Sequence, residues 1–362
     1  MSPRERVAAA FAHREPDRVP AWCGASPDFL AKAEAALGLD EEAFRRRIGD
    51  DFRRVTAPWR DPGPPLATGS TWRSPFGVER RGIGYGQPVC HPLAQAASGA
   101  DHAARMAAFA AWPWPDAEDV DVSGLRAQAK AWGGEYAVLG GDWSPFWHDV
   151  IDLVGMEGLY YLMYDDPEAA TLLFDRVTGF YLDSSARIFE EAEGLIDIFF
   201  IGNDFGSTTG PLFGPDIYER FISPSIRRLA ELGHRRGLKV MLHCCGGYRP
   251  LVPLMVRDGL DGLHALQPRC AGMDPASLKR DFGGQVLLNG AIDSQTVLLE
   301  GDPTLARAET LRTLAIMAPG GGYVAGPSHD WLLGETPLEN VLALYDAVAE
   351  WNDGAGRMEG GT

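Results

Sequence analysis

Residues 240–247 combine side chains that can bind a metal with an apolar run that can place them. Val240, Met241 and Leu242 are followed by His243, Cys244, Cys245 and two glycines. Alternate side chains of an extended segment point the same way, so His243 and Cys245 would share a face that Cys244 does not. An imidazole and a thiolate can bind one soft divalent ion, although a complete site needs three or four ligands. A buried cysteine pair beside a hydrogen-bonded histidine is the alternative interpretation.

Two further apolar runs end in residues that could transfer protons or complete a metal site. Asp204 follows the apolar residues 199–201 and a glycine. Its carboxylate could orient a substrate, act as acid or base, or support a metal ligand, unless it forms an Asx turn or caps a helix. His329 follows residues 322–325 and could be a third ligand or a proton carrier, unless it lies on a surface loop. We therefore predict Asp204 and His329 as catalytic residues.

Weaker candidates follow other apolar runs and are interpreted in the same way. We predict that the substrate contacts a set of polar residues at these positions: Asp142, His148, Asp204, Asn289, Asp293 and Gln295. His264 and Cys270 are interpreted as core and loop residues. The candidate metal ligands are His243, Cys245 and His329.

Composition limits the classes of function. The 362 residues carry a formal net charge of -17, which disfavours binding to nucleic acid or to anionic membranes. A local basic pocket could still bind an anion. Five cysteines, two of them adjacent, indicate reduced thiols rather than a disulfide framework. No apolar run approaches the roughly 20 residues that span a bilayer, so we expect a cytoplasmic protein.

From residue 136 onward, short apolar runs alternate with helical segments, which is typical of parallel strands covered on both faces. Strands are predicted at 136–140, 196–201, 238–242, 260–266, 285–289 and 322–325. A strand at 19–22 and one within the irregular residues 51–92 would bring the number to eight. Helices are predicted between these strands, including single helices over 27–50 and 149–164. The rival, a doubly wound open sheet, usually carries a glycine-rich turn after its first strand, and none is found there.

The pattern predicts one (β/α)8-barrel domain over residues 1–351, with an N-terminal elaboration of helices and a hairpin, and a flexible tail over 352–362. Active sites of such barrels form at the carboxyl ends of the strands. The candidate residues, which come from distant stretches of sequence, are therefore expected to meet at one end of the barrel.

An ordered set of motifs resembles the uroporphyrinogen decarboxylase superfamily over nearly the whole chain. The motifs are RERV at 4–7, HREPDRVP at 13–20, DFG at 204–206, GPL at 210–212, HCCG at 243–246, GAID at 290–293, GGY at 321–323 and PLEN at 337–340. The resemblance implies a (β/α)8 barrel.

Within that superfamily, the chain resembles the corrinoid-dependent methyltransferases more than the decarboxylases. The decarboxylases hold substrate carboxylates with an arginine-rich N-terminal loop, whereas the matching residues 21–26 contain no arginine. In the methyltransferases, a His-x-Cys motif and a later cysteine bind zinc, which keeps a thiol acceptor as thiolate. His243 and Cys245 match the first two ligands. The third cysteine falls near residues 327–328, where this chain has His329 nearby, so His329 or Asp204 would complete the site, or no zinc binds.

The resemblance also implies partners. The sequence has no Asp-x-His-x-x-Gly pattern for a corrinoid, so a corrinoid would arrive on a separate protein. A homodimer is expected by analogy with similar barrels. Two other functions stay open: a metal-free decarboxylase or lyase acting on a small carboxylate or a tetrapyrrole through Asp204 and His329, and a non-catalytic binder of a tetrapyrrole or small ligand.

Overall fold

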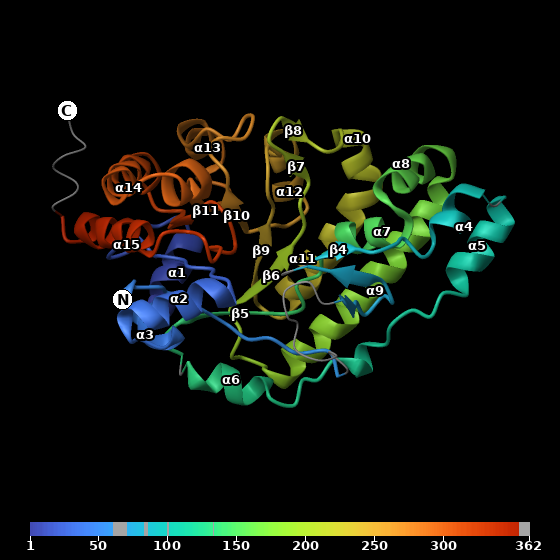
Figure 1. Cartoon of the computed structure of the whole chain (residues 1–362), viewed down its shortest axis with the longest axis horizontal. Coiled ribbons are helices and arrows are strands. Elements are labelled where there is room, and N and C mark those ends of the chain that lie inside the picture. Colours follow the sequence, from blue (N-terminus) through green and yellow to red (C-terminus); the bar gives the residue numbers. More distant parts are fainter. Residues whose placement is uncertain (61–70, 83–85, 100, 133, 355–362) are drawn as a thin grey trace.

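The computed structural model describes residues 1–60, 71–82, 86–99, 101–132 and 134–354 (Figure 1). Its main sheet contains seven strands, and every neighbouring pair is parallel. In spatial order these strands are β1 (Phe52–Arg54), β5 (Ala137–Gly140), β6 (Ile198–Gly202), β9 (Lys239–His243), β10 (Gly262–Leu266), β11 (Leu287–Ile292) and β12 (Tyr323–Pro327). Nearly all of their side chains are buried, as expected for a sheet that is covered on both faces.

The segment around Ala21 closes the sheet into a barrel. Ala21 forms parallel bridges with Asp50 on one side and Ala325 on the other. The Trp22 N–H donates to the carbonyl of Ala325 at 2.9 Å, and the Asp51 N–H donates to the carbonyl of Ala21 at 3.0 Å. The predicted (β/α)8 barrel is therefore confirmed. The strand predicted at 19–22 is reduced to a bridge, and the strand predicted within 51–92 is β1.

Helices cover the outside of the barrel, one or more after each strand of the main sheet from β5 onward (Figure 1). They are α7 (Phe146–Val154), α8 (Met156–Asp165), α9 (Pro167–Glu191), α10 (Pro215–Ile217), the π-helix η2 (Tyr218–Ile222), α11 (Ser223–Arg235), η3 (Arg249–Leu251), α12 (Val252–Arg257), α13 (Pro275–Phe282), the π-helix η4 (Ser294–Leu299), α14 (Pro303–Met317) and α15 (Leu338–Asn352). Many begin at a proline or an aspartate cap, as the sequence pattern indicates.

Two predicted helices are wrong in their extent because each contains a glycine that breaks it. The helix predicted over 149–164 is divided into α7 and α8 at Gly155, whose φ is +82°. The helix predicted over 27–50 is divided into α2 (Pro27–Leu37) and α3 (Glu41–Arg47), and Gly38 ends the first with φ +69°. Glycine adopts this left-handed conformation at little cost and thereby ends helices.

The interior of the barrel is apolar at its amino-terminal end. Alternate residues of β6 divide between two layers: Ile198 and Phe200 belong to the inner cluster, whereas Phe199 and Ile201 pack outward under the helices. Helix α1 (Pro3–Phe11) contributes Val7, Ala10 and Phe11 to the inner cluster. Its Arg4 N–H donates to the carbonyl of Glu135, just before β5 begins. Helix α1 therefore closes the amino-terminal end and leaves the carboxyl end of the strands for a site.

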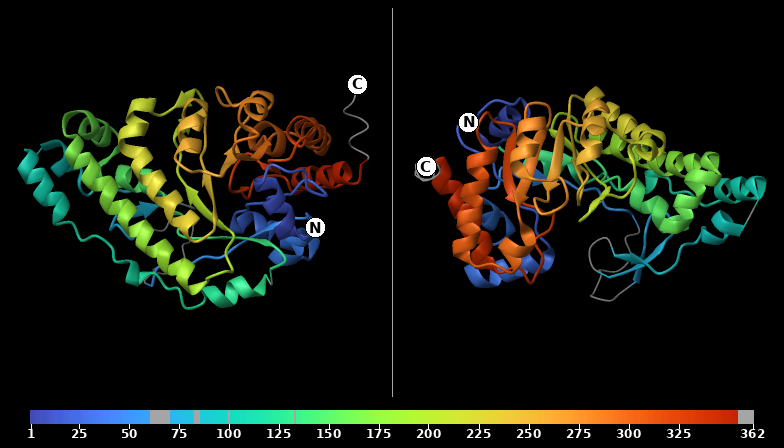
Figure 2. Two further views of the ribbon diagram at one scale, coloured as in Figure 1. Left: turned by 180° about the vertical axis from the view of Figure 1, so that it is seen from behind. Right: turned by 90° about the horizontal axis from the view of Figure 1, so that it is seen from above.

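The predicted elaboration extends from the barrel to the end of the molecule opposite α14 and α15 (Figure 2). Its elements are β2 (Thr71–Arg73), β3 (Glu79–Arg81), β4 (Gln87–Pro88), α4 (Ala94–Gly99), α5 (His102–Ala110), η1 (Ala117–Asp119) and α6 (Leu125–Ala131). Strands β2, β3 and β4 pair antiparallel, which confirms the predicted hairpin. A short hairpin of β7 (Gly206–Ser207) and β8 (Gly210–Pro211) follows β6.

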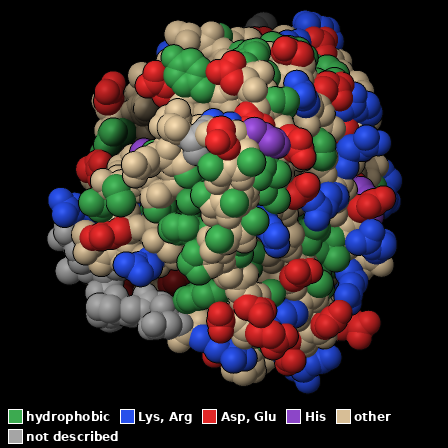
Figure 3. All heavy atoms as spheres, turned by 90° about the vertical axis from the view of Figure 1, so that its right-hand side faces the viewer, with side chains coloured by type: hydrophobic (Ala, Val, Ile, Leu, Met, Phe, Trp, Pro, Cys, Tyr) green, Lys and Arg blue, Asp and Glu red, His purple; other side chains and the backbone are tan. Residues whose placement is uncertain are grey.

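Figure 3 shows the end of the molecule that lies on the right in Figure 1. Its surface carries acidic and basic side chains around a central group of apolar ones. Helix α8, at the same end in Figure 1, exposes Met156, Tyr161 and Tyr164. Among the described residues, no helix is both long enough and apolar enough to cross a membrane. Of the predicted flexible tail, Asn352 is the last residue of α15, and residues 355–362 lie outside the described part of the chain.

Candidate functional site

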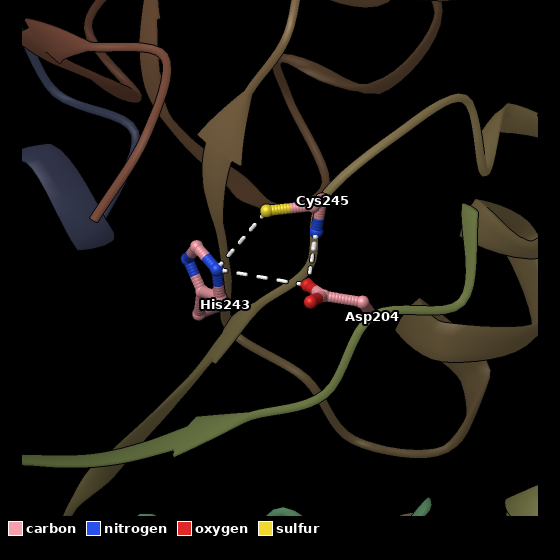
Figure 4. Close-up of side chains that lie close together, drawn as sticks. All are labelled: Asp204, His243 and Cys245. Carbon is pink, nitrogen blue, oxygen red and sulfur yellow. Dashed lines mark hydrogen bonds and ion pairs between the residues drawn. The ribbon is translucent and has the colours of Figure 1, made fainter. Parts of the chain in front are cut away.

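Three side chains with metal-binding atoms meet beyond the carboxyl ends of β6 and β9 (Figure 4). His243 Nε2 lies 3.3 Å from Cys245 Sγ and 3.7 Å from Asp204 Oδ1, and the three ligand atoms all lie within 4.8 Å of one another. Ligands of a tetrahedral zinc ion with bonds of about 2.0–2.3 Å are separated by about 3.3–3.7 Å. A nitrogen, a sulfur and an oxygen at these distances therefore fit around one zinc ion.

The register of β6 and β9 brings the three residues together. Gly202 pairs with His243, and the Asn203 N–H donates to the carbonyl of His243 at 2.9 Å. Beyond the strands, the Cys245 N–H donates to Asp204 Oδ1 at 2.8 Å. Cys244 lies in the outer core, where its Sγ accepts from the Phe205 N–H at 3.3 Å. The alternation predicted from the sequence therefore places Cys245 and Cys244 in different environments.

Two of the three candidate ligands, His243 and Asp204, are oriented by a further residue. His243 Nδ1 lies 3.1 Å from Nδ1 of His264 on β10, which is fully buried. His148 Nε2 accepts from the Asp204 N–H at 3.1 Å and lies 3.4 Å from Asp204 Oδ2. The Trp143 ring lies 5.4 Å from the imidazole ring of His243. Such outer contacts fix the direction of a ligand and are typical of metal sites.

The local environment sets the charge of these groups. Burial and the negative charge of Asp204 raise the pKa of Cys245 well above its usual value. Burial lowers the pKa of His243, so its imidazole is neutral. Burial acts to raise the pKa of Asp204, but its hydrogen bonds with His148 and with the Cys245 N–H hold it well below its usual range. The chain thus presents a carboxylate and a neutral imidazole beside a thiol that a cation would ionise.

The three residues open into a cavity of about 500 Å³. A cavity of this size is large enough for a small organic molecule. Its lining combines aromatic, charged and ligand residues: Arg54, Trp72, Trp143, His148, Gly202, Asn203, Asp204, His243, Cys245, His329, Asp330, Trp331 and Leu333.

Comparison with known proteins identifies the family. The family model described as uroporphyrinogen decarboxylase (URO-D) matches residues 122–351, which include the three candidate ligands. The chain belongs to the URO-D family. Among solved structures, a methyltransferase from Methanosarcina mazei matches this URO-D barrel with a TM-score of 0.68 and 18% identity, over 97% of this chain and 99% of that chain. This likeness shows a shared fold. No protein of curated function matches the sequence significantly.

The cavity of about 500 Å³ is called the main cavity below, because the three donor atoms lie on its wall. Five of the predicted site residues line it: His148, Asp204, His243, Cys245 and His329. The ring centroid of His329 lies 6.2 Å from that of His243, and its Nδ1 lies 3.0 Å from the carbonyl oxygen of Trp331. The group of three donor atoms consists of Asp204, His243 and Cys245, and it does not include His329.

The other predicted substrate contacts lie elsewhere. Asp142 Oδ2 accepts from Ser184 Oγ of α9 at 2.9 Å, and Asn289 is fully buried inside the barrel. Asp293 accepts backbone N–H groups at the start of η4. Together with Gln295, it lines a neighbouring cavity of about 260 Å³. These four residues are therefore not brought into the main cavity.

The residues of the site that were not predicted from the sequence include Arg54, Trp143, His264 and Asp330. Arg54 is the last residue of β1, so the strand-end rule would have identified it if this strand had been located within the irregular residues 51–92. His264 lies within a buried strand, and its burial agrees with the interpretation as a core residue. Its contact with His243 depends on the pairing of β9 with β10, which the sequence does not show.

Proposed function

We propose that this URO-D family member is a zinc-dependent methyltransferase. The observation that carries the proposal is the convergence of His243, Cys245 and Asp204 at ligand distances on the wall of a cavity. Three protein ligands with a fourth position open to substrate are typical of catalytic zinc, whereas structural zinc is enclosed by four. The acceptor would be a small thiol, and the donor a methylated corrinoid carried by a separate protein.

The residues around the cavity have distinct roles in this proposal. When bound, zinc would lower the pKa of the substrate thiol and keep it as the thiolate, the stronger nucleophile. His264 orients His243 from behind, and His148 orients Asp204. Trp143 and Leu333 contribute apolar surface to the wall of the cavity. His329, on the same wall, accepts the proton that the thiol loses. A methylcorrinoid on the partner protein would supply the methyl group to this sulfur and would itself be the leaving group.

Metal analysis of the purified protein tests the proposal directly. The wild type is expected to hold about one zinc per chain, and Cys245→Ser is expected to lose most of it, because each ligand contributes to the affinity. Cys270→Ser is the matched control, since this half-buried thiol lines the neighbouring cavity and is outside the donor group. X-ray absorption should find a single sulfur ligand. A wild type that binds zinc no more tightly than Cys245→Ser would refute the metal site.

Activity measurements separate the three functions that the sequence left open. With methylcobalamin as donor and small thiols as acceptors, we expect methyl transfer that a chelator abolishes and zinc restores. Release of carbon dioxide from small acids, unaffected by a chelator, would favour the decarboxylase through Asp204 and His329. Binding of a tetrapyrrole without turnover of any donor would favour the non-catalytic alternative.

A further inference from the structure

Arg54 enters the main cavity with its hydrogen-bonding capacity unused. Its Cζ lies 4.8 Å from the ring centroid of Trp143 and 5.3 Å from that of Phe200. The nearest carboxylate, Asp330 Oδ2, lies 3.9 Å from Nη1, which is beyond hydrogen-bond distance. Within the part of the chain that the structure describes, no acceptor is hydrogen-bonded to the guanidinium of Arg54.

The neighbouring arginines are hydrogen-bonded to carboxylates, whereas the ion pair of Arg54 with Asp330 is longer, at 3.9 Å. Arg53, the preceding residue, forms an ion pair with Glu42 at 2.8 Å and donates to two backbone carbonyls. Arg45 forms ion pairs with Asp50 at 2.7 Å and with Glu41 at 2.9 Å. Both line a second cavity of about 660 Å³, to which Arg54 also contributes. Of these three cations, Arg54 is the one left to bind a ligand.

The Arg54 side chain is 35% exposed and lines the cavity wall, so a ligand in the cavity would replace part of its hydration. Burial lowers the pKa of Arg54, which the charges of Asp330 and Asp142 offset in part. The guanidinium of arginine has five N–H donors in one plane. A planar oxyanion such as a carboxylate binds it most strongly, because it accepts two parallel hydrogen bonds. The formal net charge of -17 would not draw a polyanion to the protein from a distance, but it does not prevent one local ion pair with a small acid.

We propose that Arg54 binds the carboxylate of the substrate, so that the substrate of this site is a small carboxylic acid. The Trp143 indole lies close to both groups, 4.8 Å from Arg54 Cζ and 5.4 Å from the His243 ring, so one small molecule could reach from Arg54 to the donor group. The acid group would bind Arg54, and the reacting atom would reach His243, Asp204 and Cys245. The identity of the reacting atom rests on the proposed function, whereas the binding of the acid does not.

Calorimetric titration with two probes that differ in charge tests this proposal. The probes are 3-mercaptopropanoate and its neutral amide, 3-mercaptopropanamide, added to the zinc-loaded protein. The wild type is expected to bind the acid about tenfold or more tightly than the amide, as for a charged bidentate hydrogen bond. Arg54→Gln should reduce this preference to about twofold or less, and Arg54→Lys should leave an intermediate value, because lysine keeps the charge without the planar fork.

Arg269→Gln is the matched control. Arg269 pairs with Asp293 at 2.8 Å and lines the neighbouring cavity, so its removal should leave the preference for the acid unchanged. The proposal is overturned if the wild type binds acid and amide equally, or if Arg54→Gln keeps the preference. Should Arg54→Gln fail to fold, Arg54→Lys decides, since a preference that is fully retained there contradicts bidentate binding.

Two further measurements separate this proposal from the proposed function. If the metal site is as proposed, Cys245→Ser weakens binding of both thiol probes and keeps the ratio between them. If the metal site fails but Arg54 binds the acid, propanoate, which has no thiol, binds as tightly as 3-mercaptopropanoate, and Arg54→Gln weakens both. The two failures therefore give different patterns of affinity.

Discussion

The pair of histidines behind the donor group determines which nitrogen of His243 can bind a metal. His243 Nε2 faces Cys245 Sγ at 3.3 Å, and His243 Nδ1 faces His264 Nδ1 at 3.1 Å. With Nε2 as the ligand atom, a neutral His243 carries its proton on Nδ1 and donates it to His264. His264 then accepts as a neutral imidazole, which agrees with a pKa that burial lowers well below the usual value. A neutral acceptor supports the ligand without adding negative charge to the site.

Asp142, which the sequence suggested as a substrate contact, provides a prediction on the dependence of stability on pH. Burial raises its pKa to about 6, although the Ser184 hydrogen bond acts to lower it. The unfolded value is about 3.9, so between pH 4 and pH 6 the folded state binds the proton more tightly and the free energy of unfolding falls as pH rises. The free energy of unfolding of Asp142→Asn, measured relative to that of the wild type, should therefore increase by about 1–2 kcal/mol from pH 4 to pH 7.

Urea unfolding of both proteins at a series of pH values measures this difference. Comparing the variant with the wild type cancels the contributions of other buried carboxyl groups, such as Asp50 and Asp152, whose pKa values burial also raises to about 6. A stability difference that stays constant from pH 4 to pH 7 would show that Asp142 titrates normally.

At the scale of elements, the loops after β6 and β9 touch through their backbones. A Cβ on Gly206 would lie 2.7 Å from the nitrogen of Gly247, and a Cβ on Gly246 would lie 2.3 Å from the carbonyl carbon of Gly206. Gly246 also has a φ of +86°. Glycine at these positions allows the close approach in which Cys245 N–H reaches Asp204 Oδ1. The absence of a side chain at Gly246 therefore allows the two loops to approach through their backbones.

Gly246→Ala is expected to separate the two loops. The added methyl group overlaps the Gly206 backbone and favours a negative φ, so we expect a loss of about 2–4 kcal/mol in the free energy of unfolding. Zinc affinity should fall with it, because the distance between Asp204 and Cys245 increases. The control is Gly237→Ala, where φ is +74° but no atom lies within 4 Å of the added Cβ. This variant should cost about 1 kcal/mol and leave zinc binding intact. Equal zinc affinities in the two variants would contradict the argument.

At the scale of the whole molecule, Asp51 connects the closure of the barrel to the helix that plugs it. Its Oδ2 accepts from the Ala21 N–H at 2.9 Å, and its Oδ1 pairs with Arg6 of α1 at 2.5 Å. The side chains of Asp51 and Arg6 are 1% and 5% exposed. Closure at Ala21 depends on a single bridge to each side, so the buried carboxylate supports the shortest part of the sheet.

Asp51→Ala should therefore be strongly destabilising. The change leaves the buried Arg6 with one partner fewer and removes the acceptor of the Ala21 N–H, at a cost of about 3–5 kcal/mol. Asp17→Ala is the control, because Asp17 also pairs with Arg6, but its side chain is 41% exposed. Exposed pairs contribute about 1 kcal/mol or less. Unfolding in urea, followed by circular dichroism, measures the stability of both variants. Similar losses in the free energy of unfolding would show that the burial of Asp51 does not explain its contribution to stability.

Much of this architecture was predictable from the sequence because it depends on local patterns. Apolar runs separated by helical segments predicted six strands of the sheet, and the strand-end rule placed Asp204, His243 and Cys245 at the same end of the barrel. The alternation of side chains along an extended segment separated Cys244 from Cys245. Each of these inferences needs only a few consecutive residues and the general geometry of parallel barrels.

The remaining features depend on contacts between distant segments, which no local pattern encodes. The pairing of Gly202 with His243 and the contact of the two glycine loops place Asp204, rather than His329, beside Cys245. The three-residue strand β1, too short to show a period, delivers Arg54 to the cavity. Register and loop approach are determined by the packing of the whole barrel, so the sequence alone determined which residue types could meet, and the tertiary structure decided which of them do.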